Sequence, residues 1–197
     1  MRVAGLVLAG GRSSRMGKNK ALLRLPDGQT FLENALGILA EACEAVWISR
    51  APDQNYGSLP CVADRRVGLG PLGGIAAGLA HIKSLGFDAA QVLACDLPLM
   101  RPSLLAPLRD APPGALLSVW RDGQSGRLEP LAALYFCSAL PFLEDALANG
   151  RLALKNAVPA WGVAIRDYGP SLAACFCNCN TPEEYRSLAG FCDHGSA

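Results

Sequence analysis

The stretch VAGLVLAGG, residues 3–11, follows the first two residues of the chain and decides the fold class. Its first six residues are an apolar run of strand length, and Ala9-Gly10-Gly11 ends that run. A short apolar run closed by glycines is typical of a strand buried on both faces, the kind found in parallel sheets. The sequence therefore predicts a buried first strand with a glycine-rich turn at its carboxyl end.

Downstream of this strand, patterns typical of helices and strands alternate. Thr30 and Glu33 have the spacing of a capping box at the start of a helix. We expect helices over 31–42, 72–85, 139–149 and 182–189, a short helix after Pro102, and strands over 45–49, 61–63, 91–95, 115–120, 131–136 and 174–179. This order predicts a Rossmann-like three-layer α/β sandwich: a mostly parallel sheet with helices on both faces. Ligands of such sheets bind beyond the carboxyl ends of the strands, near a topological switch point.

Length and composition fit one globular domain over residues 1–197. Half of the residues are hydrophobic (51%), 18% are charged, and the formal net charge is +1. A balance this close to neutral favours neither nucleic acid nor an anionic membrane as a partner, so an anionic ligand would need a local site. The first apolar run is too short for a secretory signal, and no run reaches the ~18 residues of a membrane span. We expect a cytoplasmic protein.

The chain has eight cysteines, which we interpret as reduced thiols in or near the core. Cys175, Cys177 and Cys179 alternate within the last predicted strand. Residues two apart in a strand lie roughly 6.6 Å apart, whereas the Cβ atoms of a disulfide lie about 3.8 Å apart. We therefore expect these three cysteines to pack rather than to bind a metal, with Phe176, Asn178 and Asn180 on the opposite face.

The segment LAGGRSSRMGKNK, residues 8–20, combines glycines with four cations within nine residues: Arg12, Arg15, Lys18 and Lys20. Glycine lets the backbone approach an anion closely, and consecutive amides can form an anion-binding nest. A triphosphate requires both features, amides to cradle its oxygens and cations to offset its charge. The alternative is a basic surface turn. The position directly after the first buried strand favours phosphate binding.

Two familiar phosphate-binding loops do not match this segment. A Walker A loop would require glycine where Met16 stands, and Ser or Thr after Lys18 where the chain has Asn19. A dinucleotide fingerprint would require glycine at Arg12. The loop is therefore of another type.

Residues 8–20 resemble the signature loop of the small nucleotidyltransferases, and most closely that of the molybdenum cofactor guanylyltransferases, often called MobA. Four further segments resemble motifs of that family in the family's order: 70–79 (GPLGGIAAGL), 95–99 (CDLPL), 129–135 (EPLAALY) and 178–183 (NCNTPE). Together they span nearly the whole chain. The resemblance implies a Rossmann-like nucleotidyltransferase domain over residues 1–197.

The resemblance also implies roles for the loop residues. The family's contacts with the GTP phosphates carry over to Leu8, Ala9, Gly10, Gly11 and Lys20. Arg15 is a second candidate cation for catalysis beside Lys20. Arg12 and Lys18 fall at variable positions, where solvated surface charges are the alternative.

Asp96 ends a predicted buried strand, where a carboxylate can hold Mg²⁺ together with phosphate oxygens and water. The equivalent aspartate of the family holds the metal, so we expect Asp96 to do so and to take part in catalysis.

Asp64 corresponds to a GTP-contacting aspartate of the family, with a simple turn residue as the alternative interpretation. The family has a residue near the nucleotide after its second strand, and this residue is often Asn. Its nearest counterpart in this chain is Ser49. Asn178 and Asn180 correspond to residues near the pterin substrate, so we expect Asn180→Ala to impair the use of molybdopterin more than GTP binding.

The reaction implied is transfer of GMP from GTP to a terminal phosphate oxygen of molybdopterin, with release of pyrophosphate. A cytidylyltransferase for the same cofactor, using CTP, is the nearest alternative. Those enzymes tend to have Ala where this chain has Gly10 and Gln where it has Leu97, so the resemblance favours the guanylyl type. A non-catalytic nucleotide-binding partner in molybdoenzyme maturation is another alternative, and it would be expected to lack Lys20 or Asp96. GTP and molybdopterin are thus the expected substrates, with molybdoenzyme maturation proteins as further candidate partners.

Overall fold

A computed structural model describes residues 1–9, 20–64 and 68–191. Its strands are β1 (Val3–Leu8), β2 (Val46–Arg50), β3 (Cys61–Ala63), β4 (Ala89–Ala94), β5 (Leu117–Asp122), β6 (Leu128–Phe136) and β7 (Val163–Tyr168). Its α-helices are α1 (Phe31–Ala42), α2 (Gly70–Ser84), α3 (Leu140–Ala148) and α4 (Pro182–Phe191). Shorter 3₁₀ helices cover Lys20–Leu22, Pro102–Leu104, Ala106–Arg109, Cys137–Ala139, Leu154–Asn156, Ala160–Gly162 and Pro170–Phe176.

The seven strands form one sheet in the order β3-β2-β1-β4-β6-β5-β7. β1 pairs in parallel with β2 and β4, and β2 pairs in parallel with β3. β6 runs antiparallel to both of its neighbours, β4 and β5, while β5 and β7 are parallel to each other. The chain turns from one side of β1 to the other between β3 and β4, so the switch point lies between β1 and β4.

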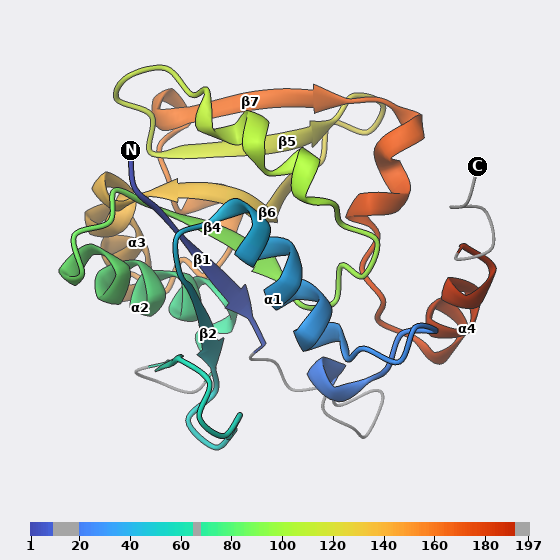
Figure 1. The fold of residues 1–197 in the computed structure, drawn as a ribbon. Helices are drawn as coiled ribbons and strands as arrows, with labels where there is room; N and C mark the ends of the chain where they lie inside the picture. The colour runs from blue at the N-terminus through green and yellow to red at the C-terminus, as the bar shows by residue number, and fades with distance from the viewer. Residues whose placement is uncertain (10–19, 65–67, 192–197) are drawn as a thin grey trace.

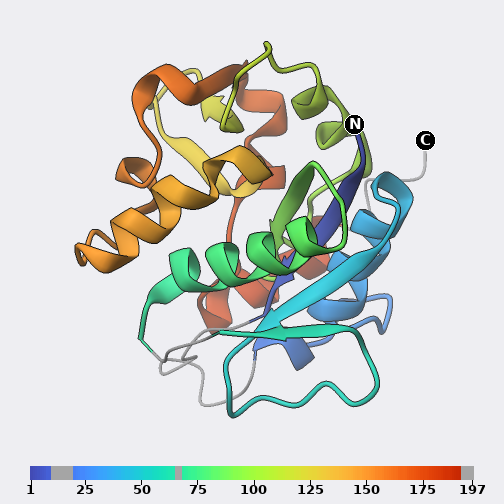
Figure 2. The same ribbon diagram turned by 90° about the vertical axis from the view of Figure 1, so that its left-hand side faces the viewer.

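Helices cover both faces of the sheet (Figure 1), which confirms the predicted three-layer α/β class. α1 packs on one face together with the 3₁₀ helices around Leu105 and Leu108. α2 and α3 pack on the other face, toward the viewer in Figure 2. Because both faces are covered, β1 and β4 are buried along their whole length, as their apolar runs require.

The helices follow local signals that the sequence displays. Thr30 Oγ1 accepts a hydrogen bond from the Glu33 amide at 3.1 Å, and Glu33 Oε2 accepts one from the Thr30 amide at 2.6 Å, which confirms the predicted capping box. On the opposite face α2 lies close to β1, because a Cβ atom at Gly78 would stand 2.3 Å from Leu6 Cδ2. The glycine therefore allows the close helix–sheet contact.

The prediction of a strand over 174–179 is wrong. Pro170–Phe176 is a 3₁₀ helix with its proline in the first turn, and 177–180 follow outside any helix or strand. β7, which the sequence analysis missed, takes the edge position beside β5 instead. Its residues are mostly half-buried or exposed, so it lacks the apolar run that marks a buried strand.

Because residues 174–179 form no strand, the strand spacing that predicted the packing of Cys175, Cys177 and Cys179 does not apply to them. Cys175 and Cys179 are buried, whereas Cys177 is exposed and its thiol donates to the Ala173 carbonyl. The seven cysteines in the described part of the chain are free thiols: Cys43, Cys61, Cys95, Cys137, Cys175, Cys177 and Cys179.

Within residues 1–9, 20–64 and 68–191, every helix is too short or too polar to span a lipid bilayer.

Candidate active site

The predicted nucleotide-binding residues meet at the carboxyl edge of the parallel strands. Leu8 ends β1 and Ala9 follows it, Ser49 belongs to the end of β2, Asp64 follows β3, and Asp96 lies two residues after β4. The switch point between β1 and β4 lies at the centre of this row. Parallel pairing places these ends side by side, which is where open α/β sheets bind their ligands.

Lys20 connects two segments that are distant in the sequence. Its Nζ lies 3.7 Å from Asp96 Oδ2 and also donates a hydrogen bond to Asn180 Oδ1, 160 positions along the chain. The side chains of Lys20 and Asp96 are 18% and 19% exposed, so both charges are largely withdrawn from water. Burial raises the pKa of the Asp96 carboxyl above its usual value, and the nearby Lys20 ammonium opposes that shift. A metal ion or a phosphate at this site would therefore interact in a poorly screened environment.

α4 and the segment before it hold Asn180 in place. Glu184 Oε2 accepts hydrogen bonds from the Asn180 amide at 2.6 Å and from the Thr181 amide at 2.8 Å. Thr181 Oγ1 accepts in turn from the Glu184 amide at 3.2 Å, which completes a capping box. Directly upstream, the Cys179 amide donates to the Asp96 carbonyl at 2.8 Å. These bonds fix the start of α4 against the end of β4.

Ser49 and Asp64 form a second polar pair, on the β2–β3 side of the edge. Ser49 Oγ donates to Asp64 Oδ1 at 3.2 Å, and burial raises the pKa of the Asp64 carboxyl. Gly74 in the first turns of α2 packs on this pair, since a Cβ atom there would stand 2.4 Å from Ser49 Oγ. Asp64 is therefore part of a built polar group rather than an isolated turn residue.

A groove of about 470 Å³ extends from this centre toward the opposite half of the sheet. It includes Asn178 and Asn180, so the structure brings the predicted pterin-side residues to the cavity beside Lys20. The groove is lined by Leu97, Arg127, Leu128, Glu129, Pro130, Leu131, Leu154, Phe176, Cys177, Asn178, Asn180 and Glu184. Cys177 shares this lining with the asparagines, so the expectation that the cysteines and asparagines occupy opposite faces is wrong.

This edge also includes Arg127, Glu129 and Tyr168, for which the sequence alone predicts no role. The antiparallel direction of β6 brings its first residues, Leu128 and Glu129, to the carboxyl ends of β4 and β5. The only sequence signal was the segment 129–135, which resembles a family motif. Three predicted site residues, Gly10, Gly11 and Arg15, lie outside the described residues, as do Arg12 and Lys18.

Asp96 offers one carboxylate to a divalent cation. No group of three or more His, Cys, Asp or Glu side chains is placed to hold a metal ion anywhere in residues 1–9, 20–64 and 68–191. Mg²⁺ commonly binds through one or two carboxylates together with substrate phosphates and water, so a single partly exposed aspartate fits such an ion.

Comparison with known proteins identifies the family of this chain. The model of the MobA-like NTP transferase domain matches residues 5–159. The chain belongs to the MobA-like NTP transferase family. A relative from Chloroflexus aggregans named "Probable molybdenum cofactor guanylyltransferase" is 34% identical over 97% of this chain and 95% of its own length.

Solved structures show the same MobA-like fold. Molybdopterin-guanine dinucleotide biosynthesis protein A from Archaeoglobus fulgidus superposes with a TM-score of 0.74 at 23% identity, over 98% of this chain and 99% of that one. Rv0371C from Mycobacterium tuberculosis, solved in complex with manganese, gives a TM-score of 0.62 at 17% identity, over 95% and 98% of the two chains.

Proposed function

We propose that this member of the MobA-like family transfers GMP from GTP to molybdopterin, forming molybdopterin guanine dinucleotide and releasing pyrophosphate. The observation that carries the proposal is the meeting of Lys20, Asp96 and Asn180 at the switch point, at one end of a groove large enough for an acceptor. The relative named as a molybdenum cofactor guanylyltransferase matches nearly the whole chain, which supports the same reaction.

In the proposed reaction a terminal phosphate oxygen of molybdopterin attacks the α-phosphorus of GTP. This oxygen is ionised near neutral pH, so no strong base is needed. The main obstacle is repulsion between two anions, which the Lys20 ammonium would offset at the triphosphate. Ser49 and Asp64 lie on the β2–β3 side of Lys20 and would contact the nucleotide, while Asn178 and Asn180 would contact the acceptor.

We propose Mg²⁺ as the cofactor and Asp96 as its ligand. When bound, the ion would neutralise phosphate charge and align the reacting groups. Lys20, 3.7 Å from Asp96, holds a positive charge beside the carboxylate and would stay close to the same phosphates. The finished dinucleotide would then pass to proteins that mature molybdoenzymes.

Incubation with molybdopterin, Mg²⁺ and each ribonucleoside triphosphate in turn tests this proposal. We expect pyrophosphate release and a dinucleotide with GTP, and far less with CTP, ATP or UTP, because a site that hydrogen-bonds a base edge rejects mismatched bases strongly. Mass spectrometry identifies the product. Equal or better use of CTP would instead assign the chain as a cytidylyltransferase, and no pyrophosphate with any nucleotide would indicate a binding protein.

A further inference from the structure

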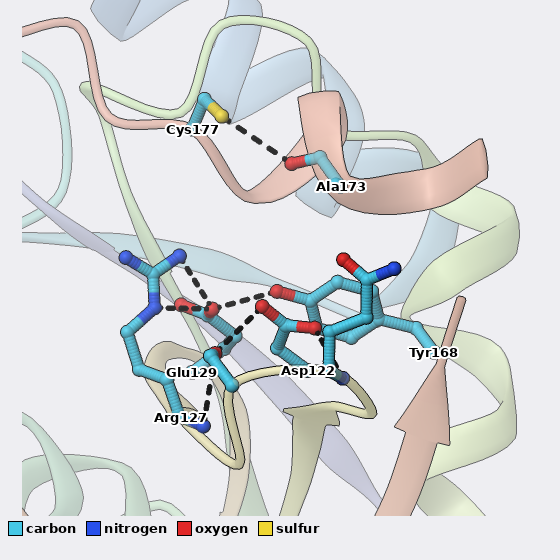
Figure 3. A network of polar contacts seen from close by, with 8 residues as sticks. Asp122, Arg127, Glu129, Tyr168, Ala173 and Cys177 are labelled. Atoms are coloured by element: carbon cyan, nitrogen blue, oxygen red, sulfur yellow. Dashed lines mark hydrogen bonds and ion pairs between the residues drawn. The ribbon is translucent and has the colours of Figure 1, made fainter. Parts of the chain in front are cut away.

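A second polar cluster lies at this groove, around the start of β6 and the end of β7 (Figure 3). Glu129 Oε1 accepts hydrogen bonds from Arg127 Nε at 3.0 Å and from the Tyr168 hydroxyl at 2.8 Å, and Arg127 Nη2 lies 2.9 Å from the same oxygen. Tyr168 is itself fixed by stacking on Phe176, with ring centroids 4.2 Å apart. Arg127, in the turn directly before β6, and Tyr168, at the end of β7, therefore hold one carboxylate in place.

All of these contacts fall on one oxygen of the carboxylate. Within the described part of the chain, Glu129 Oε2 makes no hydrogen bond or ion pair, and it is not among the fully buried atoms. The Glu129 side chain is only 13% exposed and lines the groove. Attraction to Glu129 raises the pKa of the Arg127 guanidinium, so Arg127 keeps its positive charge beside the carboxyl group. Oε2 is thus a positioned acceptor that lines the groove.

The groove links this carboxylate to the proposed reaction centre. Leu97, next to Asp96, and Asn180, which contacts Lys20, line the same groove as Arg127 and Glu129. Ser49 and Asp64 lie across β1 and β4 from this cluster, on β2 and after β3. An acceptor whose phosphate reaches Lys20 would therefore extend its other end toward Glu129.

We propose that Glu129 recognises the pterin ring of the acceptor, an inference that rests on the proposed function. A pterin carries a 2-amino group and an adjacent ring N–H on one edge, and Glu129 Oε2 can accept a hydrogen bond from the 2-amino group. Arg127 and Tyr168 act as positioning residues, because they occupy Oε1 and leave Oε2 directed to the ligand. Guanine presents the same 2-amino-4-oxopyrimidine edge, but its expected place is on the Ser49–Asp64 side.

The test uses Glu129→Gln in the full chain, with Glu144→Gln, an exposed residue of α3, as a matched control. Glutamine keeps the shape but loses the charge and one acceptor. We expect the KM for molybdopterin to rise about 10-fold to 100-fold and the KM for GTP to stay within a factor of about two. Glu144→Gln should match the wild type. Tyr168→Phe, which keeps the stacked ring, should raise only the KM for molybdopterin, by a smaller factor.

Two pairs of analogues separate ligand recognition from a structural role. Wild type should bind pterin more tightly than lumazine, which carries an oxygen in place of the 2-amino group, and Glu129→Gln should lose that preference. The preference for GTP over inosine triphosphate, which lacks the 2-amino group of guanine, should persist. Circular dichroism and GTP binding check that the variant folds.

The outcomes distinguish this inference from the proposed function. Wild-type protein that forms no dinucleotide refutes the function. Normal wild-type activity, with an unchanged pterin-to-lumazine preference in Glu129→Gln, overturns the assignment of Glu129. Loss of the preference for GTP over inosine triphosphate would assign the carboxylate to guanine instead. An equal rise in both KM values would make its role structural.

Discussion

At the residue scale, the proposed chemistry depends on a few charges that are partly withdrawn from water. Lys20 and Asp96 neutralise each other across 3.7 Å, and each is less than one fifth exposed. Removal of either partner leaves a poorly solvated charge and also removes a proposed contact with phosphate or metal. The two substitutions should therefore both reduce turnover, but by different routes.

We expect Lys20→Ala and Asp96→Asn each to lower the rate by a factor of roughly 10² to 10³, the usual effect of losing one electrostatic contact in an active site. Asparagine keeps the shape and one acceptor oxygen, so added Mg²⁺ should partly restore Asp96→Asn and leave Lys20→Ala unchanged. Initial rates across a Mg²⁺ series measure this. Near-normal turnover by folded Asp96→Asn at low Mg²⁺ would remove Asp96 from the metal site.

The contact between Asn180 and Lys20 changes the expectation for the two asparagines. Asn178 lines the groove without contacting Lys20, so Asn178→Ala should raise the KM for molybdopterin about 10-fold and leave that for GTP unchanged. Asn180→Ala also removes the acceptor that holds Lys20, so it should raise both constants. Steady-state kinetics with each substrate varied separately decides this, and the same pattern for both variants would contradict it.

At the scale of elements, the site depends on how closely helices approach the carboxyl edge. α2 begins at Gly70, after β3 has ended at Ala63, and its residues Gly74 and Gly78 let it lie against β2 and β1. α4 is held at its first turn by the Thr181–Glu184 capping box. Glycine in a helix lowers stability relative to alanine. A helical glycine at a position where a Cβ atom would collide with the sheet therefore indicates that close helix–sheet packing requires it.

Gly74 and Gly37 give a matched pair of helix substitutions. A Cβ atom at Gly74 would stand 2.4 Å from Ser49 Oγ, so Gly74→Ala should separate Ser49 from Asp64, lower the free energy of unfolding by about 1–3 kcal/mol and weaken GTP binding. Gly37 is exposed in α1 and meets nothing within 4 Å. Gly37→Ala should therefore raise the free energy of unfolding by about 0.5–1 kcal/mol.

Urea unfolding and GTP titration measure both variants of this pair. Gly37→Ala should bind GTP as the wild type does. Tight GTP binding by Gly74→Ala would mean that Ser49 and Asp64 are not needed at the nucleotide.

At the scale of the whole molecule, the proposed roles divide the sheet into two halves on either side of β4. The half with β1, β2 and β3 carries the proposed nucleotide residues, and the half with β6, β5 and β7 carries the groove and Glu129. Thiols are distributed through both halves. Burial raises the pKa of Cys95 to about 12 and those of Cys43 and Cys179 to about 11.

The eight cysteines should titrate as free thiols in denatured protein without reductant, and metal analysis should give no zinc. In native protein near pH 8, the thiols with raised pKa should react slowly with a thiol reagent, because the thiolate is the reactive form. Cys177, which is exposed, should react faster than Cys95. Stoichiometric zinc, or two or more disulfides, would contradict this reading.

Local pattern was sufficient for much of the fold. The apolar runs that became β1 and β4 mark strands buried on both faces, and the Thr30–Glu33 spacing marks the start of α1. Pattern failed where an element is not fully buried. β7 lies at a sheet edge and shows no apolar run, whereas the apolar run at 174–179 packs into the core as a 3₁₀ helix and the irregular segment that follows it. Apolar runs report burial, and burial alone does not distinguish these conformations.

The sequence by itself determined the strand–helix alternation, the position of Asp96 at the end of a buried strand and the resemblance to a family. Only the tertiary structure decided which of these residues meet. Lys20 and Asn180 are 160 positions apart, and Glu129 reaches the ligand-binding edge because β6 runs against its neighbours. The physical reason is that hydrophobic periodicity depends on neighbours along the chain, whereas strand order and direction depend on packing between distant segments.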